Sequence, residues 1–214
     1  MTLKFGLYAE LQNLLLDRMV WFLRNVDLGQ GLAGIIDRYH ADIEQVAQAL
    51  DRILPEELAA LKAARVDALQ KAGVPDELAR RIGDLRALGA ATDIALVASQ
   101  TQQPVVDVAA TYFAAGAFFR LDRVAAAARE IRLTDYFDRL AYDRALAQIG
   151  EALRALTAHM VAAGAPGREA VERWAQARAR DVERTRLAIH EIVASGLTLS
   201  KLAVAANMLS DLAR

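Results

Sequence analysis

The segment Gly29–Gly34 spells the pattern Gly-x-Gly-x-x-Gly. In dinucleotide-binding folds this pattern directly follows a buried strand, so that a pyrophosphate can approach the N-terminus of the next helix. Here the preceding apolar run has a helical period and is separated from the glycines by Arg24, Asn25 and Asp27. The acidic residue about twenty positions further on, Asp51, falls within an expected helix. We therefore interpret the glycines as a connection between helices and predict no cofactor-binding residue.

The pair His190-Glu191 begins like the zinc-protease pattern His-Glu-x-x-His. That pattern needs a second histidine, so that one helix face presents two imidazole ligands, but the corresponding position holds Ala194. His40 and His159 are isolated in the sequence, and we interpret all three histidines as structural or surface residues. A three-histidine site assembled in space stays the alternative to our expectation of no metal ligand.

Three carboxylates, Asp93, Asp107 and Asp122, lie in the most apolar part of the chain. Buried acids with raised pKa values can serve as general acids or bases. We favour a structural interpretation, in which these acids cap helices or pair with neighbouring arginines, and we assign no catalytic residue. The neighbouring arginines are Arg86, Arg120 and Arg123.

Four aromatic side chains gather in one short stretch of the chain. At helical spacing such a group more often packs a core or an interface than a ligand pocket. A pocket lined by them stays the basis of an alternative function. The four residues are Tyr112, Phe113, Phe118 and Phe119.

The composition favours helices and excludes several kinds of site. Of the 214 residues 55% are apolar, mostly Ala and Leu, which are strong helix formers, and only 4 Pro and 12 Gly interrupt them. The absence of cysteine excludes disulfides, thiolate metal sites and cysteine nucleophiles, and it fits a reducing compartment. The formal net charge of −1 gives no support for binding to nucleic acid or to an anionic membrane.

No apolar run is long enough to span a bilayer. The longest weakly charged stretch, Leu85–Phe119, contains charged and polar residues, so we interpret it as buried core. The N-terminus, Met1–Phe5, begins no apolar signal-peptide core. We therefore expect a cytoplasmic protein with no membrane contact.

Apolar residues recur at spacings of three and four along most of the chain, which predicts helices. Pro55 and Pro75, each followed by two acidic residues, suit helix starts, and Thr134 with Asp135 in the first turn suits an N-cap. Because of Gly83 and Gly89, the region that starts at Pro75 is either one helix or two short helices with a bend. We expect the other helices over about 3–24, 32–53, 55–73, 104–116, 121–131, 134–163, 167–195 and 198–212.

These helices predict an all-α fold, a bundle of about eight to ten helices. Two long antiparallel helices, joined by a turn at Pro166, should occupy the C-terminal half. We treat 1–214 as a single helical domain, with an optional division near 100–104 into 1–103 and a C-terminal bundle over 104–214.

Several stretches, taken together in their order and spacing, resemble the C-terminal helical region of the large bacterial NAD-specific glutamate dehydrogenases. The resemblance covers nearly the whole chain, and the ordered set is far more specific than any one motif. The stretches are 15–25 (LLDRMVWFLRN), 73–81 (GVPDELARR) with 92–98 (TDIALVA), 105–116 (VVDVAATYFAAG) with Leu121-Asp122, and 171–174 (VERW) with 199–205 (LSKLAVA).

The resemblance implies a very long parent polypeptide with a central catalytic domain that binds NAD. Such an enzyme oxidatively deaminates L-glutamate to 2-oxoglutarate and ammonia. Its catalytic lysines and glycine loop belong to that central part, so the resemblance assigns no catalytic, cofactor-binding or metal residue to this chain. This chain would then be an excised C-terminal fragment, with Met1 as the start of the fragment or of a gene prediction.

We therefore predict a non-catalytic structural or regulatory region. It would pack on the catalytic domain of the same polypeptide, in a homo-oligomer of the full-length protein. The alternative is a stand-alone helical module that binds a ligand or a partner. An independent helical enzyme that uses the buried acids is the third and weakest hypothesis.

Overall fold

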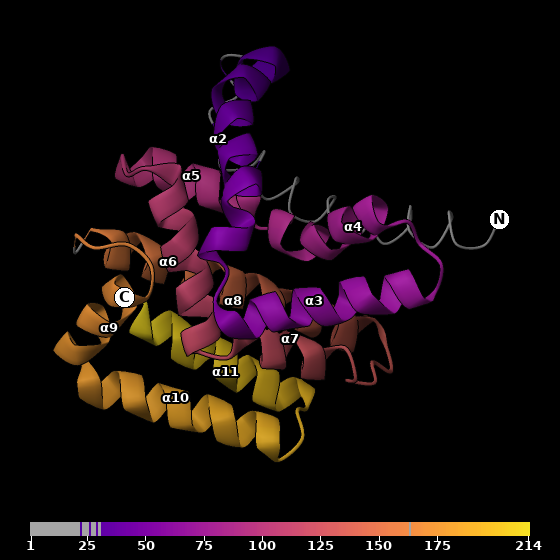
Figure 1. Cartoon of the computed structure of the whole chain (residues 1–214). Coiled ribbons are helices and arrows are strands. Elements are labelled where there is room, and N and C mark those ends of the chain that lie inside the picture. The colour runs from indigo at the N-terminus through magenta and orange to yellow at the C-terminus, as the bar shows by residue number, and fades with distance from the viewer. Residues whose placement is uncertain (1–21, 23–25, 27–28, 30, 163) are drawn as a thin grey trace. The chain divides into compact units, whose positions relative to one another are not determined.

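The computed structural model describes residues 22, 26, 29, 31–162 and 164–214. These residues form ten α-helices and no strand (Figure 1), which confirms the prediction of an all-α fold with eight to ten helices. The predicted first helix over 3–24 lies outside the described residues, apart from Phe22. The helices are α2 (Gly31–Ile53), α3 (Glu56–Lys71), α4 (Asp76–Leu88), α5 (Ala91–Thr101), α6 (Val105–Phe118), α7 (Leu121–Ala128), α8 (Tyr136–Val161), α9 (Arg168–Ala177), α10 (Ala179–Ala194) and α11 (Leu199–Leu212).

The chain divides into two compact units, Met1–Ala109 and Ala110–Arg214, and α6 contributes residues to both. In the first unit, Pro55 and Pro75 occupy the N-cap positions of α3 and α4, with acidic residues in the first turn of each helix. Both helix starts were predicted, because a proline before a helix and acids in its first turn are local signals.

The helices α3 and α4 form an antiparallel pair, and α2 packs against α5. The contact of α4 with α3 rests on a small cluster around Val74, Ala79 and Ile82. The alternative of two short helices in this region is confirmed, since α4 ends at Leu88 and α5 begins at Ala91. The interruption lies at Gly89 and not at Gly83, through which α4 runs without a break.

In the second unit, α11 lies alongside both α8 and α10 (Figure 1). The α11 residues that face this core are Leu202, Ala205, Ala206 and Leu209, and the small alanines allow the helix axes to approach closely. The predicted antiparallel pairing of α8 with a second long helix is therefore only partly right, since α8 packs mainly along α11.

The predicted long helix over 167–195 is two helices, α9 and α10, separated at Arg178. The backbone of Arg178 has φ −128° and ψ 30°, which are not helical values. Each helix buries its own apolar set: Val171 and Trp174 on α9, and Val182 and Ile189 on α10. The break lets each set meet a different neighbour, because α9 contacts α8 whereas α10 contacts α7 and α11.

Two helix ends of this unit are fixed by side chains. The N-cap of α8 is Asp135, whose carboxylate accepts a hydrogen bond from the N–H of Asp138, so the prediction of Thr134 is wrong by one residue. At the other end of the unit, Thr198 is the N-cap of α11. The ammonium of Lys201 donates hydrogen bonds to the carbonyls of Ser195 and Gly196, which satisfies the end of α10.

Candidate functional site

The helix α2 begins at Gly31, one residue earlier than predicted, so Gly31–Gly34 form its first turn. Before them, the N–H of Val26 donates a hydrogen bond of 3.1 Å to the carbonyl oxygen of Phe22, which is the i to i−4 bond of a helical turn. Phe22 is helical, whereas a dinucleotide fold needs a strand before its glycine loop. Gln30 lies outside the described residues.

The three histidines lie on three different helices and are all exposed: His40 on α2, His159 on α8 and His190 on α10. Among the residues that the structure describes, no three His, Asp or Glu side chains come together to hold a metal ion. His190 borders two adjoining hollows of the surface.

The three candidate acids share one position, the first turn of a helix. Asp93 lies in the first turn of α5, Asp107 in that of α6 and Asp122 in that of α7. A carboxylate there stabilises the helix by its attraction to the positive end of the helix dipole. Asp93 is 1% exposed, and Asp93 and Asp107 each have an interaction partner. This arrangement supports the structural interpretation of these acids.

The four aromatic residues divide between core and surface. Tyr112, Phe113 and Phe119 are buried, whereas Phe118 is half-buried. Phe118 and Phe119 border a hollow of about 190 Å³ together with residues of α10. The expectation of core packing therefore holds for three of the four rings, and Phe118 is the half-buried ring that borders the hollow beside Phe119.

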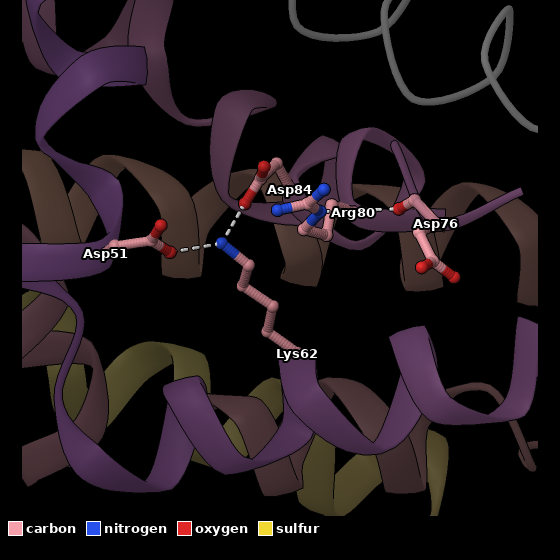
Figure 2. Close-up of polar contacts among 5 residues, drawn as sticks. All are labelled: Asp51, Lys62, Asp76, Arg80 and Asp84. Carbon is pink, nitrogen blue, oxygen red and sulfur yellow. Dashed lines mark hydrogen bonds and ion pairs between the residues drawn. The ribbon is translucent and has the colours of Figure 1, made fainter. Parts of the chain in front are cut away.

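Sequence reasoning missed Lys62, a largely buried lysine of the first unit that pairs with two carboxylates. Its ammonium lies between the carboxylates of Asp51 and Asp84, so it joins α3 to the end of α2 and to α4 (Figure 2). The side chain of Lys62 is only 17% exposed, whereas that of Asp51 is 87% exposed and that of Asp84 is 25% exposed. The sequence signal that could have revealed Lys62 is its helical spacing from Val66 and Leu69. These three residues lie on the face of α3 that packs against α4.

The protonation state of Lys62 decides whether its amine can act as a nucleophile or a base. Partial burial alone would lower its pKa, but hydrogen bonds and Coulomb attraction from Asp51 and Asp84 outweigh it and raise the pKa above 10.5. A lysine that acts as a nucleophile or a base needs a lowered pKa. Lys62 is therefore an ammonium at neutral pH, and it serves as an ionic clamp between helices.

Hollows of the described surface lie next to α10 in the second unit, and three of them bear on the argument. Two adjoin each other, because they share Arg120, Ile189 and His190 in their lining; we call this pair the basic cleft. The third, of about 490 Å³, lies between α10 and α11. The other lining residues of the basic cleft are Phe118, Phe119, Arg123, Glu183, Arg186, Leu187, Val193 and Ala194.

The first turn of α8 carries large apolar side chains in water. Tyr136 is 73% exposed, Phe137 is 76% exposed and Leu140 is 54% exposed, and the two rings meet edge to face with centroids 5.8 Å apart. We call these three residues the α8 apolar patch. Contiguous exposed apolar groups commonly mark an interaction surface.

The family model described as glutamate dehydrogenase, C-terminal, matches residues 2–211. A search of curated proteins gave no match. Within the described residues, no helix combines the length and the apolar character needed to cross a membrane.

Proposed function

The chain belongs to the glutamate dehydrogenase C-terminal family, and from this premise we propose that it is a non-catalytic helical region of an NAD-dependent glutamate dehydrogenase. The full enzyme would convert L-glutamate to 2-oxoglutarate and ammonia, with NAD bound in its catalytic part. The observation that carries this proposal is the family match over residues 2–211. We further propose that the enzyme is a cytoplasmic homo-oligomer.

The interactions of the buried and partly buried charged side chains support a structural role for this helical region. Lys62 bridges two carboxylates, and Asp93, Asp107 and Asp122 each lie in the first turn of a helix. Each of these groups stabilises the helices around it. None of them is a lysine of lowered pKa or an acid facing a second acid, which are the arrangements that deaminating chemistry would need.

We propose that the catalytic part of the same polypeptide covers the α8 apolar patch. Three side chains bury a few hundred Å² at most, since an aromatic residue buries about 150–250 Å². A stable complex between separate chains needs about 1,200–2,000 Å². A contact within one polypeptide forms over a smaller area, because the linkage keeps the local concentration of the partner high. The size of the patch therefore favours an occupant that is covalently linked.

The first experiment measures NAD binding to the 214-residue chain by calorimetry, together with glutamate-dependent reduction of NAD. We expect neither binding nor activity, and tight NAD binding would contradict the proposal. The length of the full gene product is the second measurement. A reading frame that continues upstream into a catalytic region supports the proposal, and a complete product of 214 residues contradicts it.

The double variant Tyr136→Ser/Phe137→Ser tests the patch. In the full enzyme, it should lower activity or thermal stability, whereas the 214-residue chain should keep its own melting temperature. Val204→Ser on α11 is the matched control, since Val204 is 49% exposed and lies outside the patch. Unchanged properties of the full enzyme, or a loss of stability in the 214-residue chain, would contradict the docking role.

A second candidate function, a stand-alone ligand-binding module, is favoured by one observation. The half-buried ring of Phe118 borders a hollow that is also lined by Arg120, Arg186 and His190. A gene product that ends where this chain does, with a ligand bound in that hollow, would favour this second function over the first.

A further inference from the structure

We propose that the basic cleft binds a small organic or inorganic anion through a carboxylate or phosphate group. The cleft consists of two adjoining hollows of about 190 Å³ and 80 Å³, formed between α10 and the segment where α6 ends and α7 begins. All lining residues belong to the second unit. The inference goes beyond the proposed structural role and does not depend on it.

The charge of the cleft carries the proposal. Its lining includes three guanidinium groups, of Arg120, Arg123 and Arg186, and the imidazole of His190, against one carboxylate. That carboxylate, of Glu183, already lies 3.3 Å from Arg186. Within the described part of the chain, Arg120 and Arg123 form no ion pair with any acidic side chain. Two guanidinium groups with unused donors therefore border one cavity, an arrangement suited to bidentate binding of an oxyanion.

The larger hollow between α10 and α11 provides a contrast within the same unit. Its arginines are compensated, since Arg184 lies 3.5 Å from Asp181 and Arg214 lies 3.4 Å from Asp211. The third arginine there, Arg178, stacks 5.1 Å from the ring of Trp174. The larger hollow thus has three arginines against two acids, whereas the basic cleft has three arginines against one acid, and its Arg120 and Arg123 form no ion pair within the described residues.

The backbone at Arg120 is a second, independent observation. Arg120 has φ 53° and ψ 38°, the left-handed region, and it follows the end of α6 at a position where glycine is favoured. Its side chain does not cap α7. A non-glycine residue held in this conformation, with its side chain at a cavity, is characteristic of a functional position. The fold therefore keeps a guanidinium at a position where a glycine would be less strained.

The size and the floor of the cleft define the class of ligand. Phe119 and Ile189, each 1% exposed, form an apolar floor, and the guanidinium of Arg186 lies 4.4 Å from the centre of the Phe118 ring. The larger hollow of the cleft is below the roughly 300–1,000 Å³ typical of pockets for drug-sized ligands. The cleft therefore suits a small acid or phosphate compound and is too small for a dinucleotide.

The test is a titration of the ¹⁵N-labelled 214-residue chain with inorganic phosphate and, separately, with succinate, at constant ionic strength set by chloride. We expect saturable shifts of the amide signals of Arg120, Arg123 and His190 with at least one of the two probes. The probe that binds more tightly identifies the group, phosphate or carboxylate. Shifts that do not saturate, or that chloride alone produces equally, would overturn the proposal.

Two variants make the test specific. Arg120→Gly removes the guanidinium and the left-handed strain together, so it should raise the melting temperature while weakening anion binding about tenfold. Arg139→Gln is the control: it loses the same charge in the same unit, but Arg139 pairs with Asp143 and lies outside the cleft. Equal binding by Arg120→Gly and the wild type, or an equal loss in Arg139→Gln, contradicts the site.

Discussion

The hydroxyl oxygen of Thr111 accepts a hydrogen bond of 2.8 Å from the backbone N–H of Gly167. Thr111 lies on α6 and is fully buried, whereas Gly167 is the N-cap of α9 and has φ +70°. The bond therefore joins the start of α9 to a helix 56 residues earlier in the sequence. It satisfies one of the N–H groups that the start of a helix leaves without an intrahelical partner.

Thr111→Val keeps the shape of the side chain but removes this acceptor. We expect a loss of about 0.5–1.5 kcal/mol in the free energy of unfolding, because the part-buried N–H of Gly167 loses this hydrogen bond. Thr157→Val is the matched control. Thr157 is equally buried, but its hydroxyl donates to the carbonyl of Leu153 within its own helix. Denaturant unfolding should show a smaller loss for Thr157→Val, and equal losses would refute the special role of Thr111.

The clamp at Lys62 gives a second prediction. Lys62→Met should lower the free energy of unfolding by about 1.5–3 kcal/mol, the range for hydrogen bonds to charged groups. Lys71→Met is the control, since Lys71 and Asp67 form an exposed pair within one helix, with 74% and 59% of their side chains exposed. That pair should contribute below about 1 kcal/mol.

The stability that Lys62 contributes should also depend on pH. Because its pKa is raised in the folded state, the contribution is complete below pH 10.5 and is lost as the pH rises through the raised value. Wild type and Lys62→Met should therefore converge in stability at strongly alkaline pH. A difference that stays constant across this range would contradict the ionic origin of the clamp.

Gly83 allows α4 to pack closely on α3. A Cβ added at this position would lie 2.6 Å from Cγ2 of Val66, a stiff β-branched side chain. Gly83→Ala gains about 1 kcal/mol of helix propensity but adds an overpacking cost of about 1–3 kcal/mol, so we expect net destabilisation. Gly116→Ala on α6 has nothing within 4 Å of the added Cβ and should stabilise instead. Thermal unfolding of both variants distinguishes the two cases by the sign of the change.

The helix starts at Glu56 and Asp76 could be predicted from the sequence because their signals are local: a proline followed by acids. The break at Arg178 has no such signal. The residues on both sides continue one helical period without a proline or a glycine, and the contacts of α9 with α8 and of α10 with α11 decide the interruption. A break set by tertiary packing cannot be found from periodicity alone.

The candidate sites also divide into features with a local sequence signal and features that only the tertiary structure creates. The positions of Asp93, Asp107 and Asp122 near helix starts could be inferred, since an acid near a helix start is a local pattern. The basic cleft could not be inferred, because it joins residues near 120 to residues near 190. Sequence analysis assigned Arg120 and Arg123 as partners of nearby acids, and the structure instead places both at the cleft, where they form no ion pair with an acid of the described residues.

The start of α8 carries an acid-sensitive contact. The carboxylate of Asp138 accepts hydrogen bonds from the hydroxyl and from the backbone N–H of Thr134, the latter at 2.9 Å. These bonds hold the pKa of Asp138 below its ordinary value of 3.8. The stability that the contact contributes is thus present above pH 3.8 and is lost as the pH falls through the lowered value.

Asp138→Asn should therefore lower the melting temperature at neutral pH but not well below pH 3.8, where the wild-type carboxyl is also protonated. Thr134→Val, which removes the hydroxyl donor but keeps the backbone N–H, should show a smaller loss of the same pH dependence. Thermal unfolding monitored by circular dichroism as a function of pH provides the measurement. Parallel pH profiles for the wild type and Asp138→Asn would show that another group controls the acid response of this helix.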